Sequence, residues 1–431
     1  MKILHTADLH LGQVIYQHYD RSDEHRHFFR QLERWCREER PDALLVSGDV
    51  FDMQQPSASV KKAFTDYFVE LHRQCPAMTI VITAGNHDSA SRLEADSAVW
   101  DLAGIRIVGM PPSADRQEHA ADWQEHYIVR LTTGYVVALP YMIGERQALV
   151  QSVLDKVTAE NTAGLPVVVM AHQAVTGLDA SGHNFEVGSL KTQDVSTFGT
   201  GFDYLALGHI HKPQTIGHQE DCMEPWVSYQ APVARYAGSA LHVSCDEAYP
   251  HTVSLVELHG HGGRVDIRQL RIDELRHFYV LPADASSYAS SDEALAAISL
   301  FAETTRSGYL RLRMDYAAPM PPNFAQMVYD LFAAYDDELR YNPKIIWTGV
   351  PSGSVRPDAP PTFEVADLQQ MTDPMVFVEK TKDHYAGLDL NEVRTAFEAV
   401  KAEILLMEEE SLGKAVGKPK KADKTNDTQA K

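Results

Sequence analysis

The sequence predicts an α/β fold in which short apolar strands alternate with amphipathic helices. Two observations lead to this prediction. Continuous apolar runs of strand length are separated by segments whose apolar residues recur at helical spacing, which is typical of βαβ units. In addition, several apolar runs end in side chains that can bind metal ions, and open α/β sheets hold ligands beyond the carboxyl ends of their strands.

The apolar runs are expected to form strands that are buried on both faces. An apolar run without polar alternation is typical of a central strand in a sheet covered by helices on both sides. The carboxyl ends of such strands would meet at one edge of the sheet, so their polar side chains would gather there. The runs with polar ends are residues 2–10, 42–52, 78–88, 166–173 and 203–211.

Two helices are expected between the first three strands. From Ser22 to Arg40 and from Ser57 to Gln74, bulky apolar side chains fall on one helical face. Those faces are expected to pack on the sheet and bury the apolar strands.

Composition is typical of a cytoplasmic protein with two or three domains. The chain has 431 residues, 44% of them hydrophobic, and no apolar run long enough to span a membrane. The N-terminus has no apolar signal core and the four cysteines are widely spaced, so we expect a cytoplasmic location and reduced thiols. A net charge of −21 argues against a broadly basic surface, so a polyanionic substrate would need local positive charge.

The polar strand ends supply oxygen and imidazole donors and no thiolate. Such donors suit manganese, iron or zinc better than calcium, and donor type does not select among these metals. The set is too large for one ion that keeps a position open for water, so two ions are expected, with Asp49 placed to bridge them. Their charge would exceed that of the two carboxylates and would attract phosphate. The candidate ligands are Asp8, His10, Asp49, Asn86, His172, His209 and His211.

Residues 85–88, Gly-Asn-His-Asp, also fit an ordinary turn. Glycine and asparagine tolerate positive φ, Asn and Asp bond to the nearby backbone, and Gly85 would free the chain to turn at a strand end. A single Asp-x-His is equally uninformative, and Gly-His-x-His is moderately specific. The ordered combination of all these motifs, each after an apolar run, favours a metal site.

The motifs in this order resemble those of the calcineurin-like metallophosphoesterases. These are Asp-x-His, Gly-Asp-x-x-Asp, Gly-Asn-His-Asp, a lone histidine at a strand end, and Gly-His-x-His. Within that superfamily the chain is similar to the SbcD family, the nuclease subunits of bacterial SbcCD complexes. The similar segments are residues 3–13, 46–52, 83–89, 206–214 and 236–247.

The resemblance implies a two-sheet α/β sandwich with a small α/β cap domain and a C-terminal helical docking motif. It implies a metal-dependent DNA nuclease that hydrolyses phosphodiesters with two divalent ions, most often Mn²⁺. Such nucleases act on double-strand ends as exonucleases and on single strands and hairpins as endonucleases, in DNA repair and recombination. One metal would bind Asp8, His10 and His211, the other would bind Asn86, His172 and His209, and Asp49 would bridge them.

By the same resemblance, His87 would be a catalytic residue instead of a ligand. It would approach the phosphate and donate a proton to the leaving oxygen or stabilise the developing charge. Asp88 would either orient His87 or stabilise the turn. Asp52 would either contact substrate or cap the segment that follows it.

The remainder of the chain is expected to be modular. Residues 1–270 would form the nuclease domain, and the strand and helix patterns after it would form the cap. The linker contains Pro351, Pro357, Pro360 and Pro361, and the tail has no apolar periodicity. Beyond the nuclease domain we expect an α/β cap at 271–349, a Pro-rich linker at 350–365, a helical motif at 366–412 and a disordered Lys-rich tail at 413–431.

Three candidate DNA contacts lie outside the metal motifs. Arg311 and Arg313 alternate with apolar residues, so they share the polar face of a strand and would contact phosphate or face solvent. His183 lies in a polar loop, residues 176–193, and would contact DNA or be solvated.

The helical motif has a narrow apolar seam that begins at Val393 and ends at Met407. It would dock on a helix of a partner or pack back on the cap. The resemblance names the partner as an SbcC-type, SMC-like coiled-coil ATPase. It also implies a homodimer within a heterotetramer, associated with the nucleoid.

Three functions of different classes are therefore compared. The first is a DNA nuclease subunit that works with a coiled-coil ATPase. The second is a stand-alone phosphoesterase acting on small phosphoesters, which would not need the cap, linker and terminal helices. The third is a non-catalytic scaffold, which would be expected to have lost ligands that are all present here.

Overall fold

The structure is a computed structural model. The chain divides into two compact units, Met1–Val350 and Pro351–Lys431. Apart from Arg394, the expected linker, helical motif and tail lie outside the described residues, and so does His183. The structure describes residues 1–16, 19–113, 121–144, 146–181, 192–218, 226–244, 246–247, 249–335, 338–349 and 394.

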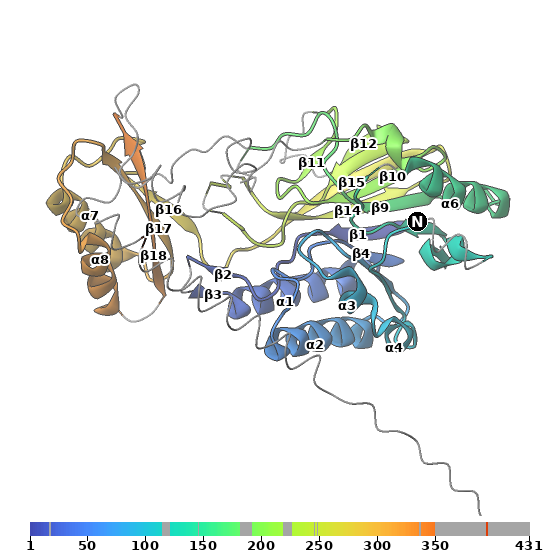
Figure 1. Cartoon of the computed structure of the whole chain (residues 1–431), viewed down its shortest axis with the longest axis horizontal. Helices are drawn as coiled ribbons and strands as arrows, with labels where there is room; N and C mark the ends of the chain where they lie inside the picture. The colour runs from blue at the N-terminus through green and yellow to red at the C-terminus, as the bar shows by residue number, and fades with distance from the viewer. Residues whose placement is uncertain are drawn as a thin grey trace, which may run out of the picture. The chain divides into compact units, whose positions relative to one another are not determined.

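A seven-stranded sheet forms one half of the module expected at residues 1–270, which we call the nuclease body after that expectation (Figure 1). Its first four strands in the chain run parallel to one another, and the three later strands join the sheet through antiparallel pairing. In chain order they are β1 (Lys2–Thr6), β4 (Ala43–Ser47), β5 (Thr79–Thr83), β6 (Ile105–Val108), β12 (Val227–Gln230), β14 (Thr252–Leu258) and β15 (Arg264–Arg271). Their spatial order is β12-β15-β14-β1-β4-β5-β6.

A six-stranded sheet forms the other half. Strands β8, β9, β10 and β13 are parallel, and the two edge strands pair antiparallel. In chain order the strands are β7 (Ile128–Leu131), β8 (Gly134–Ala138), β9 (Val167–His172), β10 (Tyr204–Gly208), β11 (Gln214–Thr215) and β13 (Val233–Tyr236). Their spatial order is β11-β13-β10-β9-β8-β7.

The two sheets pack against each other, and each carries helices on its outer face (Figure 1). In β4, Leu45 packs in the core shared with the second sheet, whereas Leu44 and Val46 pack with the helices. The apolar pattern of the strands alone predicts helices on both faces of one sheet, and that prediction is wrong. The reason is that a facing sheet buries an apolar strand face as well as a helix does, and the sequence pattern is the same.

The helices of the nuclease body lie close to their predicted positions. The first sheet is covered by α1 (Ser22–Glu39) and α2 (Ala58–Gln74), and the hydroxyl of Ser57 caps α2 by accepting from the backbone N–H of Val60. The second sheet is covered by α6 (Gln147–Glu160). The shorter elements are β2 (Val14–Ile15), β3 (Tyr19–Asp20), α3 (Ala90–Glu94), α4 (Ser97–Asp101), η1 (Trp123–Tyr127) and η2 (Val195–Phe198).

A third, three-stranded parallel sheet with its own apolar core occupies residues 278–348, which we call the cap module. Its elements follow the expected strand and helix order. They are β16 (Phe278–Leu281), α7 (Ser291–Thr304), β17 (Gly308–Asp315), α8 (Phe324–Ala333) and β18 (Leu339–Thr348). Among the helices in the described part of the chain, none is long and apolar enough to cross a membrane.

The cap module joins the nuclease body around Glu24, a buried residue in the first turn of α1. The phenolic hydroxyl of Tyr309 in β17 donates to Glu24 Oε1 at 2.5 Å. Arg21 Nη2 donates to Oε2 at 2.6 Å, and Arg276 and Arg340 approach Oε1 at 3.5 and 3.4 Å. One carboxylate thus meets three guanidinium groups drawn from both modules.

Arg311 and Arg313, the two arginines expected on the polar face of their strand, form hydrogen bonds to other residues of the chain. Arg311 pairs with Asp246 of the nuclease body, and its Nε donates to the carbonyl of Lys344 at 2.8 Å. Arg313 donates to the carbonyl of Pro282 at 2.9 Å. These side chains therefore do not simply face solvent. Neighbouring loops supply hydrogen-bond acceptors for them, which the strand pattern does not reveal.

Candidate metal centre

The polar strand ends converge, but they come from two sheets. The ends of β1, β4 and β5 belong to the seven-stranded sheet, and those of β9 and β10 belong to the six-stranded sheet. Backbone hydrogen bonds tie the first two ends together, from Asp8 N to Gly48 O at 3.1 Å and from His10 N to Asp49 O at 3.0 Å. The expected single sheet edge is therefore replaced by the line where two sheets meet.

Several of the predicted ligands occupy a backbone region that non-glycine residues rarely adopt. Asp8, His10 and Asp49 have φ values of 51°, 45° and 46°, and His209 has a φ of 94°. Such conformations are costly and collect at functional sites, where the surrounding structure enforces them. The strain lies at the strand ends that carry the donors.

Two glycines allow the strand ends to come close together. A Cβ at Gly85 would lie 2.0 Å from Asp49 Oδ1, and a Cβ at Gly208 would lie 1.8 Å from the carbonyl oxygen of Ser47. Gly85 is not among the residues with positive φ. Its expected role in turning the chain is therefore corrected: it is needed because only a hydrogen fits beside Asp49.

The seven predicted donors lie together. Possible ligand atoms of Asp8, His10 and His211 all lie within 4.8 Å of one another, and so do those of Asp8, Asp49 and His172. All five of these residues are buried.

Asn86 and His209 complete the set. The amide oxygen of Asn86 lies 3.0 Å from His172 Nε2 and 2.9 Å from His209 Nδ1. Asp49 Oδ2 is 3.3 Å from His172 Nε2 and 3.9 Å from His10 Nε2, so Asp49 lies between the two halves of the cluster.

The carboxylates of the cluster favour positive charge on its buried imidazoles. Burial alone would lower the pKa of His10, but the carboxylates of Asp52, Asp49 and Asp8 raise it to about 9. Burial likewise opposes the charge of His172, yet Asp49 and Asp8 raise its pKa to about 9. Burial would raise the pKa of Asp49, and the imidazoles of His172 and His10 hold it well below its usual range. The carboxylates thus attract cations to buried nitrogens.

His10 provides the clearest sign of an expected metal ion. Both of its ring nitrogens are buried and neither makes a hydrogen bond of normal geometry within the described part of the chain, although Nδ1 lies 3.3 Å from Asp52 Oδ1. Buried polar atoms are normally paired. The donor set, with imidazole, carboxylate and amide oxygen and no thiolate, fits two divalent ions.

His87 differs from its neighbours because it is exposed. Its backbone N–H donates to Asp49 Oδ1 at 2.8 Å, and its Nδ1 donates to the backbone carbonyl of Asp52 at 2.9 Å. A nitrogen of His87 also lies within 4.8 Å of possible ligand atoms of His10 and Asp49.

Asp88 holds the backbone of two loops. Its Oδ2 accepts from the N–H groups of Val50 at 3.0 Å and Gly85 at 2.8 Å, and its Oδ1 accepts from Phe51 at 2.9 Å. Burial and the neighbouring Asp49 raise the pKa of Asp88 to about 6. The expectation that Asp88 orients His87 is corrected, because the Asp52 carbonyl is the group that accepts from the His87 ring. Asp88 is the turn-stabilising residue of the two alternatives.

Sequence reasoning missed Glu247. This buried carboxylate lies 2.9 Å from His211 Nδ1. Burial would raise its pKa, but hydrogen bonds from His211 and His251 hold it well below its usual range. Its only signal was its place at the end of the similar segment 236–247.

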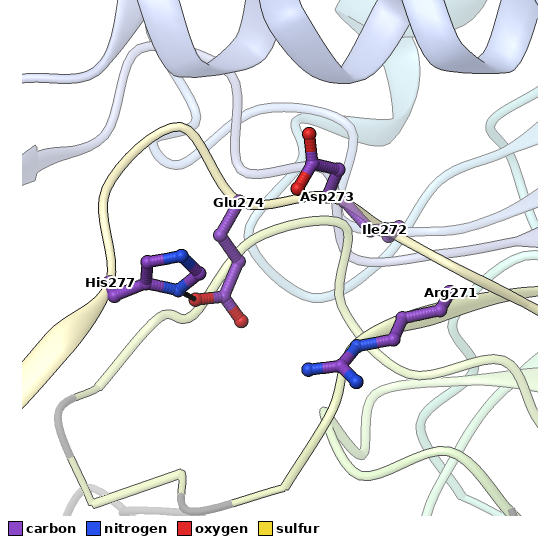
Figure 2. A pocket seen from close by; sticks show the side chains of 5 residues that line it. All are labelled: Arg271, Ile272, Asp273, Glu274 and His277. Atoms are coloured by element: carbon purple, nitrogen blue, oxygen red, sulfur yellow. Dashed lines mark hydrogen bonds and ion pairs between the residues drawn. The ribbon is translucent and has the colours of Figure 1, made fainter.

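A separate pocket lies beside the start of the cap module (Figure 2). Two of its lining side chains, Glu274 and His277, point toward each other and pair at 2.8 Å. The pocket shares no residue with the metal centre. It is lined by Arg271, Ile272, Asp273, Glu274 and His277.

Residues 1–213 match the family model described as calcineurin-like phosphoesterase. The SbcD subunit of the nuclease SbcCD from Rhodobacter capsulatus is 31% identical over 349 residues, which cover 73% of this chain and 81% of that protein. The chain belongs to the SbcD family of calcineurin-like phosphoesterases. Family membership confirms the predicted resemblance and the predicted two-sheet fold.

Two further SbcD relatives are more distant. The SbcD subunit of the Escherichia coli K12 nuclease SbcCD is 26% identical over 322 residues, covering 68% of this chain and 74% of that protein. The corresponding SbcD subunit from Bacillus subtilis is 27% identical over 281 residues, covering 60% and 66%. As a member of the SbcD family, the chain is a metal-dependent hydrolase of phosphoester bonds.

Proposed function

We propose that this protein is a DNA nuclease that hydrolyses phosphodiesters at double-strand ends and hairpins as the SbcD subunit of an SbcCD-type complex. The observation that carries the proposal is the position of exposed His87 beside a cluster of seven candidate metal donors, five of them buried, in a chain of the SbcD family. The partner would be an SbcC-type coiled-coil ATPase, with two copies of this chain in the complex.

The other six candidate ligands divide into two groups, one on each side of Asp49. Asp8, His10 and His211 would hold one ion, and Asn86, His172 and His209 would hold the other. Mn²⁺ suits these donors, and two bound divalent ions supply charge that binds phosphate and lowers the pKa of an attacking water. Asn86 contributes a neutral oxygen, so it leaves more of that positive charge for the substrate.

His87 would bind the phosphate and hold a proton for the leaving oxygen. The Asp52 carbonyl accepts from Nδ1, so Nε2 is the nitrogen that would meet the substrate. To give a proton to the leaving oxygen, the ring would have to be in its doubly protonated imidazolium form, which leaves Nδ1–H bonded to Asp52 after the Nε2 proton is transferred. Asp88 keeps the Asp52 and His87 loops together through three backbone hydrogen bonds. These contacts would place His87 before the substrate arrives.

The test is digestion of linear duplex DNA by the purified full chain with Mn²⁺, with and without the ATPase partner. We expect manganese-dependent cleavage that EDTA abolishes and that Asp49→Asn loses. Bis(p-nitrophenyl) phosphate serves as a small phosphodiester in a parallel assay. Hydrolysis of the small diester with no cleavage of DNA in either condition would favour a stand-alone phosphoesterase.

A further inference from the structure

We propose that Glu247 is a positioning residue for the metal ligand His211. The inference rests on the proposed function, because it takes His211 as a ligand of one of the two ions. Glu247 accepts the hydrogen bond of His211 Nδ1 at 2.9 Å and is itself only 2% exposed. With Nδ1 donating to Glu247, Nε2 on the opposite side of the ring is the nitrogen that would bind a cation.

A carboxylate in this position does two things for a metal-binding imidazole. It selects one tautomer and one ring orientation, and it makes the opposite nitrogen more basic. The ring of His211 also meets that of His10 edge-on, with 5.4 Å between centroids, but a ring contact of this kind selects no tautomer. In the group of Asp8, His10 and His211, the imidazole of His211 is therefore oriented by a hydrogen bond to Glu247 on the side away from the cation.

Glu247 is held firmly enough to act in this way. Its Oε2 accepts from the backbone N–H of Val243 at 3.0 Å and lies 3.3 Å from His251 Nε2. His251 is buried, and its Nδ1 donates to the carbonyl of Ser239 at 2.9 Å. Both carboxylate oxygens are thus engaged, so the carboxylate does not rotate away from His211 without losing a second contact.

The segment that carries Glu247 is also fixed from the side of the cap module. Asp246, the preceding residue, pairs with Arg311 of β17. The ring of His242 lies 4.9 Å from that of Phe278 in β16 and 4.0 Å from that of His251. His242 and Asp246, which precede Glu247 in the chain, are thus held against the cap module, as positioning of a ligand requires.

The test measures Mn²⁺ binding to the metal-free full chain by isothermal titration calorimetry, without DNA. We expect Glu247→Gln to weaken one of two Mn²⁺ sites by about 10–100-fold and to leave the other unchanged. The matched control is Glu94→Gln. Glu94 also bonds to an imidazole, His126 at 3.3 Å, and to backbone N–H groups, but it lies outside the donor cluster.

A double-mutant cycle separates positioning from general support of the fold. If Glu247 acts through His211, Glu247→Gln should cause no further loss of Mn²⁺ affinity in a His211→Ala background. Additive losses, equal weakening of both sites, or unchanged affinity in Glu247→Gln would each overturn the proposal. Normal Mn²⁺ binding by His211→Ala would instead overturn the proposed metal centre, so the two failures are distinguishable.

Discussion

The backbone carbonyl of Asp52 accepts the Nδ1–H of His87 at 2.9 Å, across two loops that leave neighbouring strands. The side chain of Asp52 meanwhile lies 3.3 Å from His10 Nδ1. One residue therefore supports both a predicted metal ligand and the predicted catalytic imidazole. Of the two roles considered for Asp52, capping of the following segment does not describe these contacts, and substrate contact stays a prediction.

His87→Ala is expected to keep both metal ions and to lose about 10²–10⁴-fold in the rate of DNA cleavage, since it removes a positioned proton donor. Metal content by mass spectrometry and cleavage of linear duplex DNA would be measured on the same preparation. His126→Ala, which removes an imidazole outside the cluster, is the control. Loss of metal from His87→Ala would make His87 a ligand and contradict the assignment.

Gly85→Ala is expected to displace Asp49 and to weaken metal binding. The new Cβ would meet Asp49 Oδ1 at 2.0 Å and Asp49 N at 2.2 Å, and overpacking of this kind typically costs about 1–3 kcal/mol. Calorimetry with Mn²⁺ and urea unfolding would report the two effects. Gly164→Ala is a useful comparison, because no described atom lies within 4 Å of that Cβ and only backbone strain is added. Unaltered Mn²⁺ affinity in Gly85→Ala would contradict the close approach.

Mn²⁺ binding at pH 7 is expected to release protons. His10 and His172 have pKa values raised to about 9 in the metal-free protein, so both hold protons at neutral pH, whereas a metal ligand must be neutral. Affinity should therefore increase with pH until about pH 9 and level off above it. Calorimetry in buffers with different ionisation enthalpies counts the protons. Binding that releases none between pH 7 and pH 8 would show that the cluster is not the binding site.

Asp88→Ala is expected to destabilise the fold by about 3 kcal/mol, because it leaves buried backbone N–H groups of two loops without an acceptor. Urea unfolding in EDTA measures this loss without a contribution from metal binding. Asp284→Ala removes an aspartate whose hydrogen bonds to Ser286 lie within an exposed turn, and it should have little effect. Equal effects of the two substitutions would argue against a loop-bridging role for Asp88.

Glu24→Gln is expected to destabilise the joint between the nuclease body and the cap module by about 3 kcal/mol, because three arginines lose their shared buried counter-charge. Limited proteolysis should cut near the joint sooner than in the wild-type protein. Asp66→Asn, which removes the exposed ion pair with Lys62, is the control. An unchanged cleavage pattern in Glu24→Gln would show that other contacts hold the cap module.

Much of the fold followed from local sequence pattern. The five apolar runs with polar ends are strands, and α1 and α2 lie within one residue of their predicted starts and ends. Local patterns succeed here because residue spacing directly reflects helix or strand geometry and the burial of each face. The number of sheets did not follow, since a strand face buried by a helix and one buried by a second sheet have the same composition.

The sequence by itself determined which residues are candidate donors and in what order they occur, because metal chemistry restricts residue type and strand ends restrict position. Only the tertiary structure decided their partners: Asp88 bonds to Val50 and Phe51, Asp52 supports His87, and Glu247 supports His211. These contacts join segments that are far apart in the chain. A hydrogen bond depends on distance and direction in space, and no periodicity in the sequence records either.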